Sequence, residues 1–132
     1  MPTSGTLLSP AHYRDRMPIV EVTHAPHVAA ETLQRLAQAL PHAVSLAVEC
    51  PEEPYDGTLR PGDVDVRFHS RSHFDSGGLQ IVIEVRSKWF ASRGETRQER
   101  CDELRNALSE ACETSEIGVY LSLPVAAWAE GE

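Results

Sequence analysis

The sequence predicts one α/β domain of two consecutive β-α-β units, with a four-stranded mixed sheet and two helices on one of its faces. Three observations predict this fold. Stretches with strand and helix periods alternate along the chain, the two halves repeat one element order, and their opening strands read alike. Residues 19–22 are Ile-Val-Glu-Val, and residues 81–85 are Ile-Val-Ile-Glu-Val. Each half is therefore expected to be a parallel strand pair joined by a right-handed helical crossover.

The chain length sets the domain organisation. A chain of 132 residues is long enough for one modest hydrophobic core but not for two. Residues 1–17 contain scattered prolines and polar residues without a sustained period, so we expect an N-terminal extension there. Residues 18–132 are expected to form the domain.

The first half begins with a β-branched stretch at residues 18–24, which is typical of a strand and stops at Pro26. Over about residues 28–48, apolar side chains recur at three- and four-residue steps, as on an amphipathic helix. This stripe consists of Leu33, Leu36, Ala37, Leu40 and Val44. Pro41 lies inside the pattern and is expected to kink the helix, or to end and restart it. A loop follows at residues 51–62, which contain three prolines and two glycines.

Residues 63–70 are expected to form the strand that completes the first half, because their apolar and polar side chains alternate with the period of a strand. The second half follows. Residues 79–85 form the most apolar stretch, which favours a central position in the sheet. Ser92 and Glu95 match a capping box and predict the start of the second helix. The core stripe of this helix is expected to be Cys101, Leu104, Leu108, Ala111 and Cys112. Residues 117–123 are expected to form the fourth strand.

Composition excludes several classes of partner and location. The formal charge of −8 argues against nucleic acid and anionic membranes, which need a basic surface. No apolar stretch approaches a membrane span and no signal peptide is visible, so a cytoplasmic location is expected. The three cysteines lack CxxC spacing, which favours buried thiols over a disulfide framework or a zinc site.

A sheet with helices on one face leaves its other face and its edges uncovered. Exposed sheet edges are prone to pair with other strands. Oligomerisation through that face or those edges is therefore expected.

The order of these features resembles the tautomerase superfamily over about residues 18–125. The resemblance rests on Met17-Pro18 at the start of a strand, a helix, a strand with alternating charged residues, and Arg93 before a second helix. Residues 64–70 and 92–103 look most similar to 5-carboxymethyl-2-hydroxymuconate isomerase, and macrophage migration inhibitory factor is a more distant likeness. The resemblance implies a homotrimer that isomerises a small enolisable carbonyl acid without a metal or an organic cofactor.

In that family an amino-terminal proline acts as the general base, and the resemblance implies this role for Pro18. A terminal α-amine has a pKa of about 8, which burial lowers towards neutrality. Met17 precedes Pro18 here, and a nitrogen in that peptide bond is a tertiary amide without basicity. The role therefore requires translation from Met17 or cleavage before Pro18. Otherwise the same pocket must perform a different reaction.

Arginines hold substrate carboxylates in the family, and the resemblance implies that role for Arg67 and Arg93. Asp65 stands where one of the isomerase's arginines is expected, and an aspartate would repel a dianionic substrate. That isomerase's own reaction is therefore not expected. Arg93 lies in the predicted first turn of a helix, where backbone amides also attract anions. Its alternative role is that of a solvated surface arginine.

His69 shares a strand face with Asp65 and Arg67, so the three are an alternative acid–base group if Pro18 is blocked. A metal site is not predicted from the histidines. Histidines four residues apart on a strand are separated by about 13 Å, which is too far for them to share one metal ion. Three functions stay open. The first is a tautomerase with Pro18 as base, and the second is a diverged biosynthetic isomerase or cyclase that uses Asp65, His69 or Arg67. The third is a catalytically silent trimer that serves as a binding protein.

Overall fold

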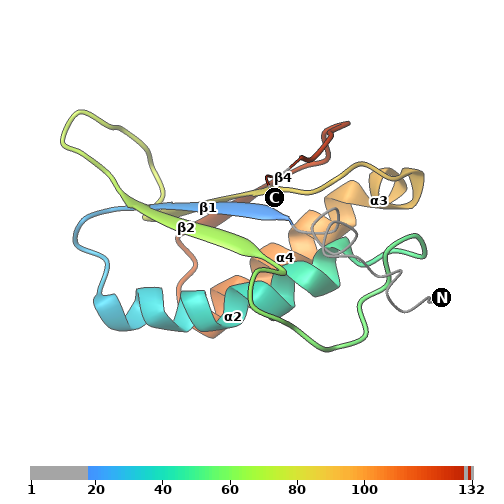
Figure 1. Cartoon of the computed structure of the whole chain (residues 1–132). Coiled ribbons are helices and arrows are strands. Elements are labelled where there is room, and N and C mark those ends of the chain that lie inside the picture. The colour runs from blue at the N-terminus through green and yellow to red at the C-terminus, as the bar shows by residue number, and fades with distance from the viewer. Residues whose placement is uncertain (1–17, 130, 132) are drawn as a thin grey trace.

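The computed structural model describes residues 18–129 and residue 131 (Figure 1). The elements in this part of the chain are β1 (Ile19–His24), α2 (Ala30–Val48), β2 (Asp65–Ser70), β3 (Ile81–Arg86), α3 (Ala91–Glu95), α4 (Arg97–Cys112) and β4 (Ile117–Ser122). Every predicted strand is present, with bounds within two residues of those expected. The extension predicted for residues 1–17 lies outside the described residues.

The sheet order is β2-β1-β3-β4, which confirms the predicted tandem arrangement. Within each half the strands run parallel, β1 with β2 and β3 with β4. The two halves join through β1 and β3, which pair antiparallel. The two strands with similar sequences therefore lie side by side at the centre of the sheet, and β2 and β4 form its edges.

Both long helices, α2 and α4, cover the same face of the sheet and pack against each other (Figure 1). The core combines alternate residues of β1 and β3 with one stripe from each helix. Its fully buried members include Val20, Val22, Leu36, Leu40, Val44, Ile83, Val85 and Leu108, each 0% exposed. The strand and helix periods of the sequence thus correspond to one continuous apolar layer.

Helix α2 runs unbroken through Pro41, so the prediction that the helix ends and restarts there is wrong. A proline inside a helix removes one hydrogen bond and costs about 3 kcal/mol. Leu40 and Val44 flank it and are fully buried, and burying such side chains contributes about 1.5–3 kcal/mol each. Tertiary packing therefore outweighs the local defect.

The capping box predicted at Ser92 and Glu95 does not form. Helix α3 begins at Ala91 without any side-chain cap, and α4 begins later, at Arg97. The Ser92 hydroxyl instead donates a hydrogen bond to the Glu52 carboxylate at 2.7 Å. A tertiary partner 40 residues away has replaced the local one that the pattern implied.

The opposite face of the sheet carries no helix in the part of the chain that the structure describes, and we call it the helix-free face (Figure 1). Strand alternation places six acidic, arginine or histidine side chains on it: Glu21, Asp65, Arg67, His69, Glu84 and Arg86. Such a polar face is compatible with water. The unpaired edges of β2 and β4 are therefore the stronger reason to expect a partner.

The described residues contain no helix that is both long enough and apolar enough to cross a membrane.

All three cysteines are free thiols, and Cys50 and Cys112 are buried as predicted. Cys101 is half-buried. Burial raises the pKa of the Cys101 and Cys112 thiols, which keeps them in their less reactive protonated form.

Candidate functional site

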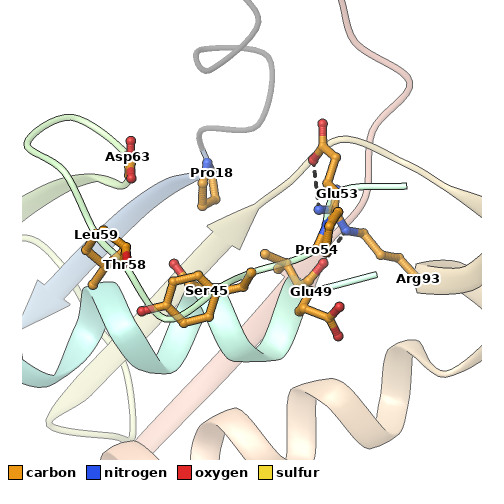
Figure 2. A pocket seen from close by; sticks show the side chains of 11 residues that line it. Pro18, Ser45, Glu49, Glu53, Pro54, Thr58, Leu59, Asp63 and Arg93 are labelled. Carbon is orange, nitrogen blue, oxygen red and sulfur yellow. Dashed lines mark hydrogen bonds and ion pairs between the residues drawn. The ribbon is translucent and has the colours of Figure 1, made fainter. Parts of the chain in front are cut away.

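Pro18 immediately precedes β1, as predicted, and is buried. Its carbonyl accepts a hydrogen bond from the backbone N–H of Asp65 at 3.0 Å, so Pro18 extends the pairing of β1 with β2. The Pro18 side chain lies in the wall of a cavity, which Figure 2 shows from close by.

We call this space the Pro18 cavity, and its volume is about 50 Å³. It lies between the start of β1, the C-terminal half of α2, the loop that follows α2, and Arg93 of α3. Its wall includes the charged side chains Glu49, Glu53, Asp63 and Arg93. In Figure 2, Asp63 lies on one side of Pro18, and Glu53 with Arg93 lies on the other. Sequence reasoning missed the three carboxylates, because a proline-rich loop has no period that could indicate its inward-facing residues.

Arg93 is buried, with 1% of its surface exposed. Its Nε donates to the Val48 carbonyl, its Nη1 donates to the Lys88 carbonyl at 2.7 Å, and its Nη2 donates to the Glu53 carboxylate at 2.9 Å. It is the third residue of the five-residue helix α3, which has no side-chain cap. The alternative role of a solvated surface arginine is therefore wrong, and the helix cap predicted beside Arg93 is absent.

A second arginine, Arg100, also binds the C-terminal end of α2. Arg100 donates from Nη1 to the carbonyls of Ala47 and Glu49, at 2.8 and 2.6 Å. With Arg93 on Val48, two guanidinium groups bind three successive carbonyls at the C-terminal end of α2. The last carbonyls of a helix lack intrahelical partners and carry partial negative charge, so these arginines stabilise the helix end that borders the Pro18 cavity.

The other three predicted site residues lie elsewhere. Asp65, Arg67 and His69 follow one another on the helix-free side of the edge strand β2, and they do not line the Pro18 cavity. Arg67 donates to Asp65 at 3.0 Å. The prediction that the three share one strand face is confirmed by the register of β2 against β1.

Glu21 is one of three members of the helix-free face that sequence reasoning missed, together with Glu84 and Arg86. One of its carboxylate oxygens lies 2.8 Å from His69 Nε2, and the other accepts a hydrogen bond from Arg86 at 2.7 Å. The hydrogen bonds with Arg86 and then His69 hold the pKa of the Glu21 carboxyl below its ordinary value of 4.5. The alternation of β1 could have indicated Glu21, because its neighbours Val20 and Val22 face the core.

The five predicted site residues thus separate into two groups. Pro18 and Arg93 border one cavity on the helix side, whereas Asp65, Arg67 and His69 lie on the helix-free face. Among the residues that the structure describes, no group of three or more His, Cys, Asp or Glu side chains could hold a metal ion.

No protein-family model and no curated protein matches the sequence. Solved structures do match the fold. One is malonate semialdehyde decarboxylase, with a TM-score of 0.61, 15% identity, and coverage of 86% of this chain and 91% of that one. Another is MIF2 of Leishmania major, with a TM-score of 0.57, 12% identity, and coverage of 88% and 96%.

A third match is a fused 4-OT that forms a symmetric trimer, with a TM-score of 0.53, 13% identity, and coverage of 80% of this chain and 85% of that one. These structures belong to the tautomerase superfamily. The chain therefore has the tautomerase fold, a four-stranded mixed sheet built from two β-α-β units.

Proposed function

We propose that this chain is an isomerase of the tautomerase type, which transfers a proton between oxygen and carbon in a small enolisable carbonyl acid. The observation that carries the proposal is the place of Pro18, which is buried before β1 and borders a cavity together with Arg93. The fold shared with malonate semialdehyde decarboxylase and MIF2 supports it. The narrower likeness to 5-carboxymethyl-2-hydroxymuconate isomerase stays a prediction.

The proposed reaction needs the Pro18 nitrogen as a free secondary amine. Its lone pair takes the proton from the enol oxygen, and the electrons of the broken O–H bond form the carbonyl. The electrons of the carbon–carbon double bond then take a proton from the protonated amine at carbon, which restores the lone pair. In the chain as numbered, Met17 is bonded to this nitrogen. The active form therefore begins at Pro18, after translation from Met17 and methionine removal or after cleavage.

Arg93 is the residue we propose for the substrate carboxylate, in competition with Glu53. It is the cation among the described residues of the cavity wall, and Glu53 holds its Nη2 at 2.9 Å. A substrate carboxylate that replaces Glu53 would keep the guanidinium paired. Glu49 and Asp63 line the same cavity and would repel a second negative charge. We therefore expect a monocarboxylate and not a dianion.

We also propose a homotrimer. A fused 4-OT with the same fold forms a symmetric trimer. Among the described residues, the edge strands β2 and β4 each have one unpaired side, which is a template for pairing with another copy. Exposed apolar side chains, among them Tyr120 on β4 and Val125 and Trp128 after it, add surface that a second copy could cover. Sedimentation equilibrium should give three times the chain mass.

One structural observation supports each of the two other functions. The His69–Glu21 pair beside Arg67 and Arg86 favours a diverged isomerase or cyclase that works on the helix-free face and leaves Pro18 unused. The three carboxylates of the Pro18 cavity favour a catalytically silent binding protein, because they disfavour the anionic substrates of a tautomerase.

Two measurements separate these functions. The intact mass of the protein from its native host shows whether the mature chain begins at Pro18. Conversion of phenylpyruvate enol is then compared between the chain starting at Pro18 and the full chain, whose nitrogen is blocked. We expect turnover in the short form alone.

In the short form, Pro18→Ala should lower the conversion rate by about 10²–10⁴-fold, the usual contribution of a positioned acid–base group. Full activity of that variant would exclude Pro18 as the base. Equal activity of both chain lengths would favour the helix-free face. No turnover by either would favour the binding protein.

A further inference from the structure

Ser87 follows β3 and is buried, with 4% of its surface exposed. Its hydroxyl Oγ is the one buried side-chain nitrogen or oxygen that has no hydrogen-bond partner in the part of the chain that the structure describes. Leaving a buried hydroxyl unpaired destabilises a protein, so native structures rarely do so without a reason.

The register of the sheet shows what lies opposite Ser87. In the antiparallel pair of β1 and β3, Ile19 faces Arg86. One step further along this register, Pro18 faces Ser87. Both residues still follow the sheet, because the Ser87 N–H donates to the Ser122 carbonyl at 3.1 Å and the Pro18 carbonyl accepts from β2.

The two side chains also lie on the same side of the sheet. Val20 and Val85 are fully buried under the helices, and side chains two residues apart on a strand share a face. Pro18 and Ser87 are therefore both on the helix side. Because the Pro18 carbonyl is directed at β2 and the Ser87 N–H at β4, the two residues form a non-hydrogen-bonded antiparallel pair. In such a pair the Cα atoms are about 4.5 Å apart and the side chains lie closest to each other.

We propose that Ser87 is a positioning residue for Pro18, whose nitrogen becomes the missing partner of the hydroxyl when Pro18 is the first residue of the chain. A proline nitrogen inside a peptide bond has no hydrogen, and its lone pair is delocalised into the carbonyl. Such a nitrogen offers a hydroxyl nothing, which accounts for the unpaired Oγ in the full chain.

The free secondary amine behaves differently. It has one N–H when neutral and two when protonated, so it can donate to Ser87 Oγ throughout the proton transfer. This bond fixes the orientation of the nitrogen and directs its lone pair, or its second N–H, toward the Pro18 cavity. Ser87 neither gains nor loses a proton in the reaction. The inference rests on the proposed function of Pro18.

The experiment compares Ser87, Ser87→Ala and Ser87→Thr in two chain lengths, one beginning at Pro18 and one complete. In the short chain, Ser87→Ala should shift the ¹⁵N resonance of the Pro18 amine and lower Tm by about 4 °C. It should also lower kcat about tenfold with little change in KM. Ser87→Thr keeps the hydroxyl and should restore the ¹⁵N resonance and kcat. In the full chain, Ser87→Ala should leave the Pro18 resonance and Tm unchanged or raise Tm.

The readouts separate failure of this inference from failure of the proposed function. An amine resonance and a kcat that do not respond to Ser87→Ala in an active short chain overturn the inference alone. An equal fall of Tm in both chain lengths also overturns it, because the hydroxyl then has a partner, such as a buried water, that does not depend on the amine. A short chain without turnover refutes the proposed function, while the ¹⁵N shift still tests the hydrogen bond itself.

Discussion

Arg93 beside the Pro18 cavity and Arg67 on the helix-free face each pair with one carboxylate, at nearly the same distance, 2.9 and 3.0 Å. Their surroundings differ. The side chains of Arg93 and Glu53 are 2% and 10% exposed, whereas those of Arg67 and Asp65 are 52% and 33% exposed. Two arginines that looked equivalent as anion-binding candidates therefore occupy different electrostatic environments.

Burial and further partners, and not the length of the ion pair, decide how much each arginine contributes to stability. An exposed pair gains little, because water screens the charges and two long side chains must be ordered. Removing one member of a buried pair leaves the other charge without solvent or partner. Arg93 also holds the Val48 and Lys88 carbonyls, which would lose their donor with it.

The largest effect is expected for Arg93→Met, which keeps much of the side-chain volume and removes every donor. It should lower the free energy of unfolding by about 3–5 kcal/mol, because the Glu53 carboxylate, whose side chain is only 10% exposed, would lose this partner. Urea denaturation measures this change. Arg97→Met, at an exposed position of α4, is the matched control and should change stability by less than about 0.5 kcal/mol. Similar losses for both variants would contradict the structural role of Arg93.

An intermediate effect that depends on pH is expected for Glu21→Gln. Hydrogen bonds with Arg86 and His69 lower the pKa of this carboxyl in the folded state, so its ionised form stabilises the fold. That stability is present above the ordinary pKa of 4.5 and is lost as pH falls below it through the folded pKa.

The Gln variant should therefore be less stable near neutral pH, and its Tm should fall less on acidification than that of the parent chain. Thermal unfolding from about pH 6 to about pH 3 tests this. Glu103→Gln, on the exposed face of α4, serves as the control. Parallel acid profiles for the parent and Glu21→Gln would show that the ion-pair network of the helix-free face contributes nothing to acid stability.

The smallest effect is expected for Arg67→Ala. Its exposed pair with Asp65 should contribute about 0–1 kcal/mol, measured by urea denaturation, and less at high salt. Because Arg67 lies outside the Pro18 cavity, conversion of phenylpyruvate enol by the short chain should not change. A tenfold loss of activity in a fully folded variant would instead support the diverged isomerase or cyclase.

The strands and helices could be predicted from the sequence, because the spacing of their apolar residues matches the geometry of these elements. The alternation of Asp65, Arg67 and His69 with apolar neighbours correctly predicted that the three share one face of a strand. The helix break considered at Pro41 and the capping box at Ser92 and Glu95 did not form, because their outcome depended on contacts with residues distant in the chain. Local rules omit such contacts.

By itself, the sequence determined the element order, the apolar stripes and Pro18 before the first strand, since these depend on near neighbours and on period. Only the tertiary structure decided which charges became buried and which residues share a site. Arg93 meets Glu53 and the end of α2 through segments 40 and 45 residues apart, and the antiparallel register brings Ser87 opposite Pro18. Whether a polar group is paired, buried or exposed depends on the whole fold, because solvent is excluded only where distant segments pack together.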